Sequence, residues 1–460
     1  MSGLAQRGSD QDLLPHCFPP QHLRDSVAPV QRGSSSMQVV ILAAGEGTRM
    51  RPLTSSRSKV MLPVAGRPLL DYLVRGLIAG GVNDVVIVVG YQGLQVKAFF
   101  DANPPPDVHP KFVSDEHHNR GNAISLQHAE PHTADSFLLV NGDNLLSEED
   151  VRGLTSWRGE IVLGGYHIDQ ARQRKVPLNL SEYGFLVVED GRVTAIVEKP
   201  EDPPSEWIFT GACFFPDRSI FQAIRETPEH RATREINIPD AINTLLSVKG
   251  PGRLQKVVRW EDVGRPWFLL ETNEIEMTKP NWLGAGVHLS KPAPYATLEN
   301  LERIYIGGGT TIRNGAYIIG PTFIGPDCDI GPNCYIRPCT VLLGRNHVGN
   351  GAEVKNSIIL EGTDIPHPTY VGDSVIGAEC NLGGGTMVGN LRLRPGTVQV
   401  VTPDGKLVDT GLRKLGVVMG DHVKVGMNVS FDPGTIIGEK SLIGAGKFIR
   451  GTFPANSTVW

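Results

Sequence analysis

The first half of the chain alternates short apolar runs, rich in β-branched residues, with segments of helical spacing. Apolar runs of this length, bounded by turn residues, are typical of buried strands. The runs lie at residues 38–42, 85–89 and 137–140, and the clearest helical spacing covers residues 69–79. Strands that alternate with helices predict βαβ units and therefore a parallel sheet.

From about residue 160 the pattern becomes rich in strands. Residues 185–188 and 193–197 are apolar runs, and the pair Asp190-Gly191 lies between them. An Asp-Gly pair between two such runs predicts a β-hairpin. We expect this hairpin to extend the sheet of the first half.

After about residue 275 aliphatic and aromatic residues recur at a strict interval of six. The first series is Ile306, Ile312, Ile318, Ile324, Ile330, Ile336, Leu342, Val348 and Val354, and the second is Met419, Val425, Phe431, Ile437, Ile443 and Ile449. An α-helix repeats about every 3.6 residues and a strand about every 2, so neither explains this period. A coil of three short flat strands does, because each side then places one residue in a central column. The sequence predicts a solenoid rather than a β-sandwich, which keeps no such register.

The length of the chain and these patterns predict its division. At 460 residues it exceeds the ~250–300 residues at which single cores stop growing, so two folded domains with flanking segments are expected. Residues 1–36 mix Gln, Ser, Pro, Asp and Arg, which bury too little apolar area to order a segment, and we predict a flexible tail. The α/β domain is predicted at 37–275, a linker at 276–302 and the solenoid at 303–460.

Composition excludes some classes of function. The formal net charge is -5 with 20% charged residues, which argues against a general electrostatic affinity for nucleic acid or an anionic membrane. No run approaches the ~18 apolar residues of a membrane span, and residues 1–36 lack the apolar core of a secretory signal. Six cysteines without a C-x-x-C pair indicate free thiols. We therefore expect a cytoplasmic protein.

A glycine-rich loop with cationic residues follows the first predicted strand, at residues 42–53. Gly45 and Gly47 let backbone N–H groups approach phosphate oxygens, and Arg49 supplies a forked cation. The pattern predicts a polyphosphate site. Its spacing differs from the dinucleotide fingerprint and the Walker loop, so the loop alone leaves a structural role open.

Two aspartates are candidate metal ligands. Asp143 follows the strand at 137–140, at the carboxyl edge where α/β sheets bind ligands. Asp262 lies in the string Trp260-Glu261-Asp262-Val263-Gly264. A pair of carboxylates suits Mg²⁺, which shares its oxygen ligands with substrate phosphates, whereas either aspartate alone is as well explained by turn capping.

The loop, followed by Ser58-Lys59 and Leu62-Pro63-Val64, resembles the signature of the sugar-1-phosphate nucleotidylyltransferases. Further motifs follow in the order of that family: Asp143, then Glu198-Lys199-Pro200, then Trp260 with Asp262 and Gly264. The resemblance implies a Rossmann-like, mixed-sheet nucleotidyltransferase domain at residues 37–275 that uses Mg²⁺.

The resemblance also implies roles for individual residues. Arg49 and Lys59 take the places that embrace the nucleotide phosphates, and Lys199 takes the place that holds the acceptor phosphate. The implied nucleotide-binding set is Leu42, Ala44, Gly45, Gly47, Thr48, Arg49, Lys59, Glu116 and Gly121. The implied sugar-phosphate set is Gly184, Glu198, Lys199 and Thr210, and the implied metal ligands are Asp143 and Asp262.

The implied reaction joins a sugar-1-phosphate to a nucleoside triphosphate. A phosphate oxygen of the sugar attacks the α-phosphorus, and pyrophosphate departs in line. Because this nucleophile is already anionic, catalysis needs positioning and charge neutralisation by Mg²⁺, Arg49, Lys59 and Lys199 rather than a general base. A non-catalytic regulatory or scaffold protein is the alternative, and the retention of all these charged residues with both aspartates argues against it.

The preferred nucleobase depends on the segment around Gly121. The family often carries a Gln five residues before that Gly, where this chain has Glu116. A carboxylate accepts from an exocyclic amine and repels carbonyl oxygens. We rank dTTP or UTP first, and keep a cytidylyl or guanylyl preference with a specialised sugar or cyclitol phosphate as the alternative.

The solenoid resembles the left-handed β-helix of hexapeptide-repeat acyltransferases. Its register is predicted to break at residues 365–373, a string that resembles the acetyltransferase half of bifunctional N-acetylglucosamine-1-phosphate uridylyltransferases. The resemblance implies that His367 is the catalytic base and that acetyl-CoA acetylates an amino-sugar-1-phosphate. The remaining implied contacts to acceptor or acyl donor are Tyr370, Asn381, Asn390 and Lys414. Binding or oligomerisation without acyl transfer stays open.

Residues 391–413 interrupt the second part of the repeat and are predicted to form a loop between coils. In the resembled family such loops reach a neighbouring subunit, and β-helices of this type trimerise. The resemblance therefore implies a homotrimer.

Overall fold

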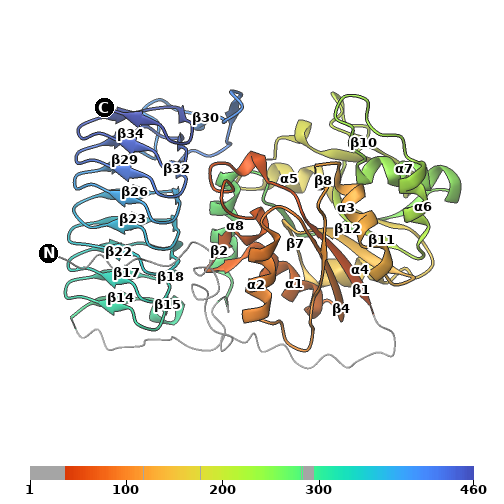
Figure 1. Ribbon diagram of the computed structural model, residues 1–460, viewed down its shortest axis with the longest axis horizontal. Helices are drawn as coiled ribbons and strands as arrows, with labels where there is room; N and C mark the ends of the chain where they lie inside the picture. The colour runs from red at the N-terminus through yellow and green to blue at the C-terminus, as the bar shows by residue number, and fades with distance from the viewer. Residues whose placement is uncertain (1–36, 118, 177, 281, 283–294) are drawn as a thin grey trace.

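The computed structural model describes residues 37–117, 119–176, 178–280, 282 and 295–460. The predicted tail at 1–36 and the middle of the predicted linker lie outside the described residues. Two folded parts stand side by side, an α/β domain and a column of stacked coils (Figure 1). The predicted fold class, a mixed α/β domain followed by a left-handed parallel β-helix, is confirmed.

A nine-stranded mixed sheet forms the centre of the α/β domain. Its strand order is β5 (Lys111–Ser114), β4 (Asp84–Val89), β1 (Gln38–Ala43), β6 (Phe137–Asn141), β11 (Trp207–Phe215), β8 (Val162–His167), β12 (Gly252–Val257), β10 (Arg192–Glu198) and β9 (Gly184–Glu189). Strand β1 pairs in parallel with β4 and β6, and β11 runs antiparallel to β6 and β8. The predicted hairpin is β9 and β10 at the edge of this sheet.

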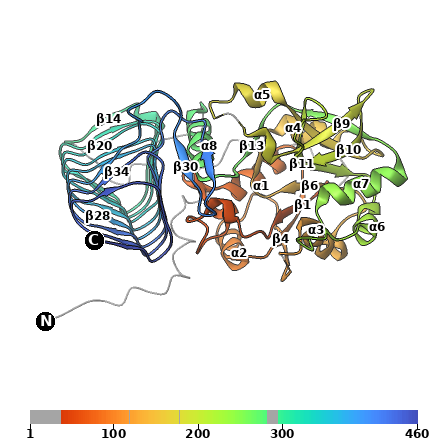
Figure 2. The ribbon, with the colours of Figure 1, turned by 90° about the horizontal axis from the view of Figure 1, so that it is seen from above.

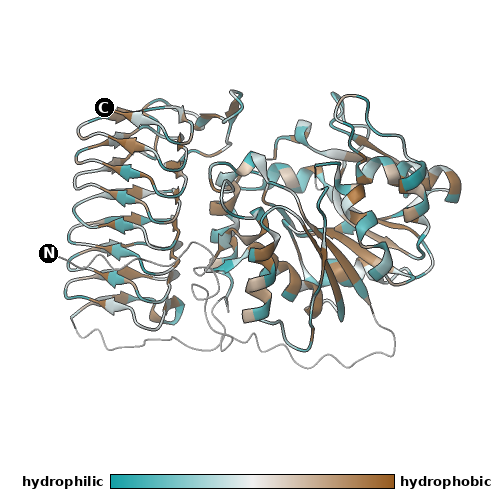
Figure 3. Cartoon of the chain, in the orientation of Figure 1, coloured by the Kyte–Doolittle hydropathy of each residue, from teal (hydrophilic) through white to brown (hydrophobic). Residues whose placement is uncertain are grey.

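Helices cover both faces of the sheet. They are α1 (Leu69–Ala79), α2 (Gly93–Ala102), α3 (Asn122–His128), α4 (Glu148–Thr155), α5 (Ile168–Gln173), α6 (Ser219–Glu226), α7 (Ile238–Lys249) and α8 (Pro266–Thr278). Along β1, Val39 and Ile41 pack in one apolar cluster with α1, α2, α4 and α8, while Val40 and Leu42 pack in another with α3, α6 and α7. A strand buried on both faces is apolar at nearly every position, and the central strands in Figure 3 are mostly hydrophobic.

The β-helix consists of three parallel sheets of eight strands each. The first is β14 (Thr297–Glu299), β17 (Tyr317–Ile319), β20 (Tyr335–Ile336), β23 (Glu353–Lys355), β26 (Tyr370–Gly372), β29 (Met387–Val388), β34 (Ser430–Phe431) and β37 (Phe448–Ile449). The second is β15 (Ile304–Ile306), β18 (Thr322–Ile324), β21 (Thr340–Leu342), β24 (Ile358–Ile359), β27 (Val375–Ile376), β32 (Val417–Met419), β35 (Thr435–Ile437) and β38 (Thr452–Phe453). The third is β16 (Thr311–Ile312), β19 (Asp329–Ile330), β22 (His347–Val348), β25 (Asp364–Ile365), β28 (Asn381–Leu382), β33 (Lys424–Val425), β36 (Leu442–Ile443) and β39 (Thr458–Val459).

The six-residue series fills the centre of this column as predicted. Ile306 lies in register with Ile324, and Ile324 with Leu342, one coil apart. All members of both series belong to one apolar cluster or pack against it. The period therefore identifies the inward-facing residue of each strand.

The predicted break at residues 365–373 is wrong. Ile365 and Val371 are fully buried members of the central column, so the coil continues through this string. The register shortens elsewhere, because Ile359 follows Val354, and Ile376 follows Val371, by five residues instead of six. The interruption is the predicted loop at 391–413, which carries the hairpin of β30 (Gln399–Val401) and β31 (Leu407–Asp409).

The second sheet of the β-helix faces the α/β domain, and α8 lies between the two parts (Figure 2). One apolar cluster contains residues of both domains. The rings of Tyr305 and Phe323 are stacked, with their centroids 4.7 Å apart. The Phe323 ring also lies against Gly66, where an added Cβ would come within 2.5 Å of the ring. The side chain of Asn273 on α8 donates to the carbonyl of Cys339 at 2.9 Å. The domains therefore share a packed interface.

A buried ion pair crosses the same interface. Nη2 of Arg57 lies 3.1 Å from Oε1 of Glu361 and 3.7 Å from Oδ2 of Asp421.

Among the described helices, none is both long and apolar enough to cross a membrane.

Candidate active sites

The loop after β1 borders a cavity of about 270 Å³ at the carboxyl edge of the sheet. The cavity is lined by Leu42, Ala43, Ala44, Gly45, Gly47, Lys59, Val60, Asn122, Ser125, Asn141 and Asp143. Gly45 is exposed, and a Cβ there would meet no atom within 4 Å, so its backbone is open to a ligand. Thr48 and Arg49 lie in the short 3-10 helix η2 (Thr48–Met50) and are exposed.

Gly47 is required by the way this loop turns. Its φ is 63°, and a Cβ would approach the Cβ of Lys59 to 2.8 Å. Lys59 begins η3 (Lys59–Met61), so the glycine lets the loop and the lysine pack directly against each other. The contact puts a cation beside the open backbone of the loop.

The two predicted metal ligands are brought together by a small antiparallel ribbon. Strand β7 (Asn144–Leu146) pairs with β13 (Trp260–Asp262), and Asn144 is the partner of Asp262. Asp143 therefore lies beside Asp262, and its carbonyl accepts from Val263 at 3.4 Å. The carboxylate of Asp143 forms an ion pair with the Lys59 ammonium.

The electrostatics of the pair fit a divalent cation. Burial and then the Asp143 carboxylate raise the pKa of Asp262. Burial is the largest single influence on Asp143 and opposes its charge, but the attraction and hydrogen bond of Lys59, together with the charge of Arg49, hold the pKa of Asp143 below its ordinary value. Two adjacent carboxylates that repel each other, beside the Lys59 ammonium, form a donor set that suits Mg²⁺.

One further segment, Glu182 and Tyr183, contacts Asp262 and two nearby arginines. The hydroxyl of Tyr183 donates to Asp262, and burial followed by that carboxylate raises the pKa of the phenol. The neighbouring Glu182 accepts from Arg265 at 2.9 Å and from Arg49 at 3.4 Å. Arg49 is half exposed, so it can move from this weak contact to a ligand phosphate.

The predicted sugar-phosphate residues adjoin the same segment. The backbone N–H of Lys199 donates to the carbonyl of Tyr183 at 3.1 Å, and the Lys199 side chain is exposed. Glu198 packs on Gly184, where a Cβ would meet its Oε1 at 2.5 Å. Burial raises the pKa of Glu198. Lys199 thus contacts Tyr183, and Tyr183 contacts Asp262.

Three predicted residues take other places. The hydroxyl of Thr210 is buried and donates to the carbonyl of Gly164 at 3.0 Å, so its side chain faces no ligand surface. Glu116 is exposed and is not among the described residues that line the cavity. Gly121 has φ 97°, and a Cβ there would lie 2.3 Å from the carbonyl oxygen of Ile236, so this glycine serves a close backbone approach.

Sequence reasoning missed three polar residues of the cavity, namely Asn122, Ser125 and Asn141. Asn122 and Ser125 lie on α3 and Asn141 ends β6. Each is adjacent to a motif that was identified, and a polar residue at a strand or helix end beside such a motif is the signal that could have found it.

In the β-helix, Tyr370 and Asn390 form one polar cluster. Nδ2 of Asn390 donates to the Tyr370 hydroxyl at 3.0 Å and to Oδ2 of Asp373 at 2.5 Å. Nζ of Lys355 lies 3.1 Å from the same carboxylate. Lys414 adjoins this cluster through its backbone bridge to Leu391. Asp373 and Lys355 were not predicted, and they organise the cluster.

His367 and Asn381 lie elsewhere on the β-helix. His367 is exposed in the turn between β25 and β26. It packs on Gly384 of the next coil, where an added Cβ would lie 3.0 Å from the Cβ of His367. Asn381 is on the third sheet, in register between Asp364 and Lys424. Within one chain, His367 and Asn381 are therefore not part of the polar cluster of Tyr370 and Asn390 at the described contacts.

Comparison with known proteins decides the family. The Nucleotidyl transferase family matches residues 38–278, more than half of the chain. The chain belongs to this family. A second match, to a domain described as the GMPPB C-terminal domain, covers residues 318–443 of the β-helix.

Relatives of this nucleotidyl transferase match over nearly its whole length. The bifunctional protein GlmU of Methanocaldococcus jannaschii is 34% identical over 433 residues, which cover 92% of this chain and 97% of that protein. The bifunctional sugar-1-phosphate nucleotidylyltransferase/acetyltransferase of Sulfurisphaera tokodaii is 31% identical over 423 residues, with 90% and 97% coverage. The bifunctional protein GlmU of Exiguobacterium sibiricum is 28% identical over 469 residues. The resemblance inferred from the motifs is confirmed.

Proposed function

We propose that this nucleotidyl transferase transfers a nucleoside monophosphate from a nucleoside triphosphate to a sugar-1-phosphate, and that its β-helix acetylates an amino-sugar-1-phosphate with acetyl-CoA. The observation that carries the first activity is the pair Asp143 and Asp262, held side by side next to Lys59 and an open glycine-rich loop. The names of the relatives at 31–34% identity support both activities.

In the proposed mechanism Asp143 and Asp262 would hold Mg²⁺, which would neutralise charge on the triphosphate. The open backbone at Gly45 and the cations of Arg49 and Lys59 bind and orient the phosphates. An oxygen of the sugar phosphate, positioned by Lys199, attacks the α-phosphorus as the bond to the departing pyrophosphate breaks. No proton has to be removed from this anionic nucleophile, so no general base is required.

A thymine or uracil nucleotide is the proposed donor. Glu116 is not among the residues that line the cavity, and this supports the ranking of these bases, whose carbonyl oxygens a carboxylate would repel. Cytidylyl or guanylyl transfer to another sugar or cyclitol phosphate is the alternative. A regulatory role without catalysis is the second alternative.

Pyrophosphate release with five nucleoside triphosphates and a panel of sugar-1-phosphates tests these assignments. We expect Asp143→Asn and Asp262→Asn each to lower turnover by at least about 100-fold, because each removes charge needed in the transition state. Asp135→Asn, at an exposed aspartate, is the matched control. Full turnover in both aspartate variants would reject the metal assignment, and no turnover by the wild type with any pair would favour the regulatory alternative.

For the β-helix we propose His367 as the base, with Tyr370, Asn381, Asn390 and Lys414 in contact with acceptor or acetyl-CoA. His367 accepts a proton from the amine as that amine attacks the thioester carbonyl, and the CoA thiolate leaves. Thiol release with glucosamine-1-phosphate or galactosamine-1-phosphate is the assay. His367→Ala should abolish it and His347→Ala, on the third sheet, should not; equal thiol release by the wild type and His367→Ala would refute the role.

A homotrimer would bring the two groups of residues together between neighbouring β-helices. Exposed apolar side chains support a contact there: Met387 is 49% and Phe448 67% exposed, on the same sheet as Tyr370. At 49.9 kDa per chain, a trimer has a mass of about 150 kDa, which light scattering measures. Met387→Asp with Phe448→Asp should yield monomers that have lost thiol release, while a wild-type monomer would contradict the assembly. A cytoplasmic location stays a prediction.

A further inference from the structure

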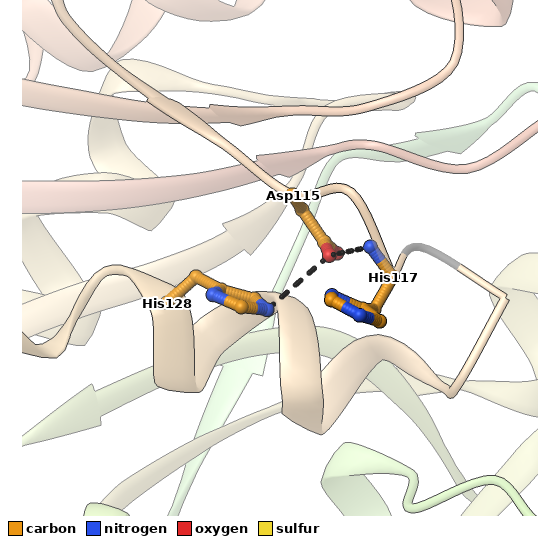
Figure 4. A group of neighbouring side chains, drawn as sticks. All are labelled: Asp115, His117 and His128. Atoms are coloured by element: carbon orange, nitrogen blue, oxygen red, sulfur yellow. Dashed lines mark hydrogen bonds and ion pairs between the residues drawn. The ribbon is translucent and has the colours of Figure 1, made fainter.

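Two histidines and one aspartate form a cluster beside the nucleotide cavity that the proposed reaction does not use. Asp115 follows β5, His117 lies in the next turn, and His128 is the last residue of α3. Their ligand atoms all lie within 4.8 Å of one another. Figure 4 shows both imidazole rings lying next to the Asp115 carboxylate, on neighbouring sides of it.

The carboxylate of Asp115 is held in place from the protein side. Its side chain is 0% exposed, Oδ2 accepts from the Ser125 hydroxyl at 2.6 Å, and Oδ1 accepts from the His117 backbone at 2.8 Å. The buried Nε2 of His128 faces Oδ1 at 3.4 Å without making a hydrogen bond within the described residues. The rings of His117 and His128 are stacked, with centroids 6.0 Å apart.

A simple ion pair between Asp115 and a protonated His128 explains only part of this geometry. Such a pair would need one histidine and would not account for the second imidazole, whose ligand atom lies within 4.8 Å of those of Asp115 and His128. Two imidazoles and a carboxylate with mutually near donor atoms are instead a donor set typical of Zn²⁺. Mg²⁺ prefers an octahedron of oxygens, so this set differs from that of Asp143 and Asp262.

The positions allow coordination after a small adjustment. Zn²⁺ binds nitrogen at about 2.0–2.1 Å and carboxylate oxygen at about 2.0–2.2 Å, so tetrahedral ligand atoms lie closer together than the spread in the cluster. His117 is exposed and can rotate inward. His117 and His128 also line a cavity of about 450 Å³ together with Arg120 and Arg225. A structural zinc site has four protein ligands, whereas this cluster offers three and leaves the fourth position open to the cavity. A metal ion bound there could therefore also bind water or a small ligand.

We propose that Asp115, His117 and His128 bind a transition-metal dication of the Zn²⁺ type, with water or a small ligand from the adjoining cavity at the fourth position. The site is separate from the Mg²⁺ site of the proposed function and does not depend on it. Ser125 connects the two regions, because it lines the nucleotide cavity and donates to Asp115.

The test uses the full chain, stripped of metal with EDTA and dialysed. Titration with Co²⁺ should give the visible absorption of a four-coordinate ion at one equivalent per chain, and Zn²⁺ should displace it, with its affinity measured by calorimetry. His117→Gln and His128→Gln should each weaken Zn²⁺ binding by at least about 10-fold. His109→Gln, at an exposed histidine, is the matched control. Circular dichroism checks that each variant is folded.

Three results would overturn the proposal. The first is a wild-type chain that binds neither Co²⁺ nor Zn²⁺. The second is unchanged binding in both histidine variants. The third is a Co²⁺ signal that excess Mg²⁺ removes and that Asp143→Asn abolishes, which would place the ion at the proposed Mg²⁺ site. If instead pyrophosphate release fails while the Co²⁺ site remains, only the proposed function is rejected.

Discussion

The ion pair between the two domains gives a direct test of how they are joined. Arg57 precedes Ser58-Lys59, and its side chain is 7% exposed, while those of Glu361 and Asp421 are 3% and 9% exposed. Arg57→Met keeps an unbranched apolar stem and removes the charge. Glu361 then stays buried without its arginine, whereas Asp421 keeps the Ser56 hydroxyl at 2.6 Å and the Ala378 N–H at 2.8 Å.

The expected loss follows from burial. Removing one partner of a buried ion pair costs roughly 3–5 kcal/mol, because a charge is left without compensation. At ~2–4 °C per kcal/mol for a cooperative unit of about 150–250 residues, the melting temperature should fall by at least about 6 °C. Arg313 is the matched control: its Nε lies 2.6 Å from Asp329, but the two side chains are 50% and 39% exposed. Arg313→Met should cost only about 0–1 kcal/mol.

Calorimetric melting, with tryptophan fluorescence as a second probe, measures both variants. If the wild type melts in two transitions, Arg57→Met should lower both, because the pair is shared by both domains. Adding Glu361→Gln should recover part of the loss, since the uncompensated charge is removed. Equal shifts for Arg57→Met and Arg313→Met would refute the reasoning.

Three further predictions concern single sites. Gly47→Ala adds a Cβ 2.8 Å from Lys59 at a φ of 63°, which should cost about 1–2 kcal/mol and lower kcat/KM for the nucleotide in the pyrophosphate assay; wild-type values for both would contradict this. Tyr183→Phe removes the donor to Asp262 and should weaken Mg²⁺ binding, seen as a raised half-saturating Mg²⁺ concentration with the fold unchanged; an unchanged concentration would contradict this. Buried thiols of the β-helix should resist a disulfide reagent at pH 8, because burial raises the pKa of Cys334 to about 12, of Cys339 to about 11 and of Cys380 to about 12. Their thiolates form only as the pH rises toward those values, so peptide mapping should show labelling that climbs steeply with pH, and a plateau near the ordinary value of 9.0 would contradict it.

Much of the fold could be predicted because it depends on which residues face inward. The run at 38–42 is apolar throughout since both faces of β1 are covered, and the six-residue series marks one inward residue per strand. The corners of the β-helix could not be placed in the same way. Two corners, between Val354 and Ile359 and between Val371 and Ile376, are one residue shorter, which keeps the strands aligned but shifts the series so that it looks interrupted.

The candidate site could be predicted where chemistry and chain order coincide. Lys59 and Asp143 belong to motifs with fixed neighbours, and they meet in the structure. Thr210 belongs to a motif too, yet its hydroxyl is used inside the sheet, which no local pattern reveals. The pair Arg57 and Glu361 is separated by 304 residues, and nothing near either residue signals the other.

The position of that pair gives the β-helix a part in the nucleotide site. Arg57, Ser58 and Lys59 are consecutive, so the segment that carries the lysine proposed to bind phosphate is fixed from two sides. Gln95 on α2 accepts from the Ser58 backbone at 3.2 Å, and Glu361 of the β-helix holds Arg57. Arg57→Met should therefore raise the KM for the nucleoside triphosphate even well below its melting transition, although Arg57 does not line the cavity. An unchanged KM in that folded variant, measured by pyrophosphate release, would mean that Lys59 is positioned by the α/β domain alone.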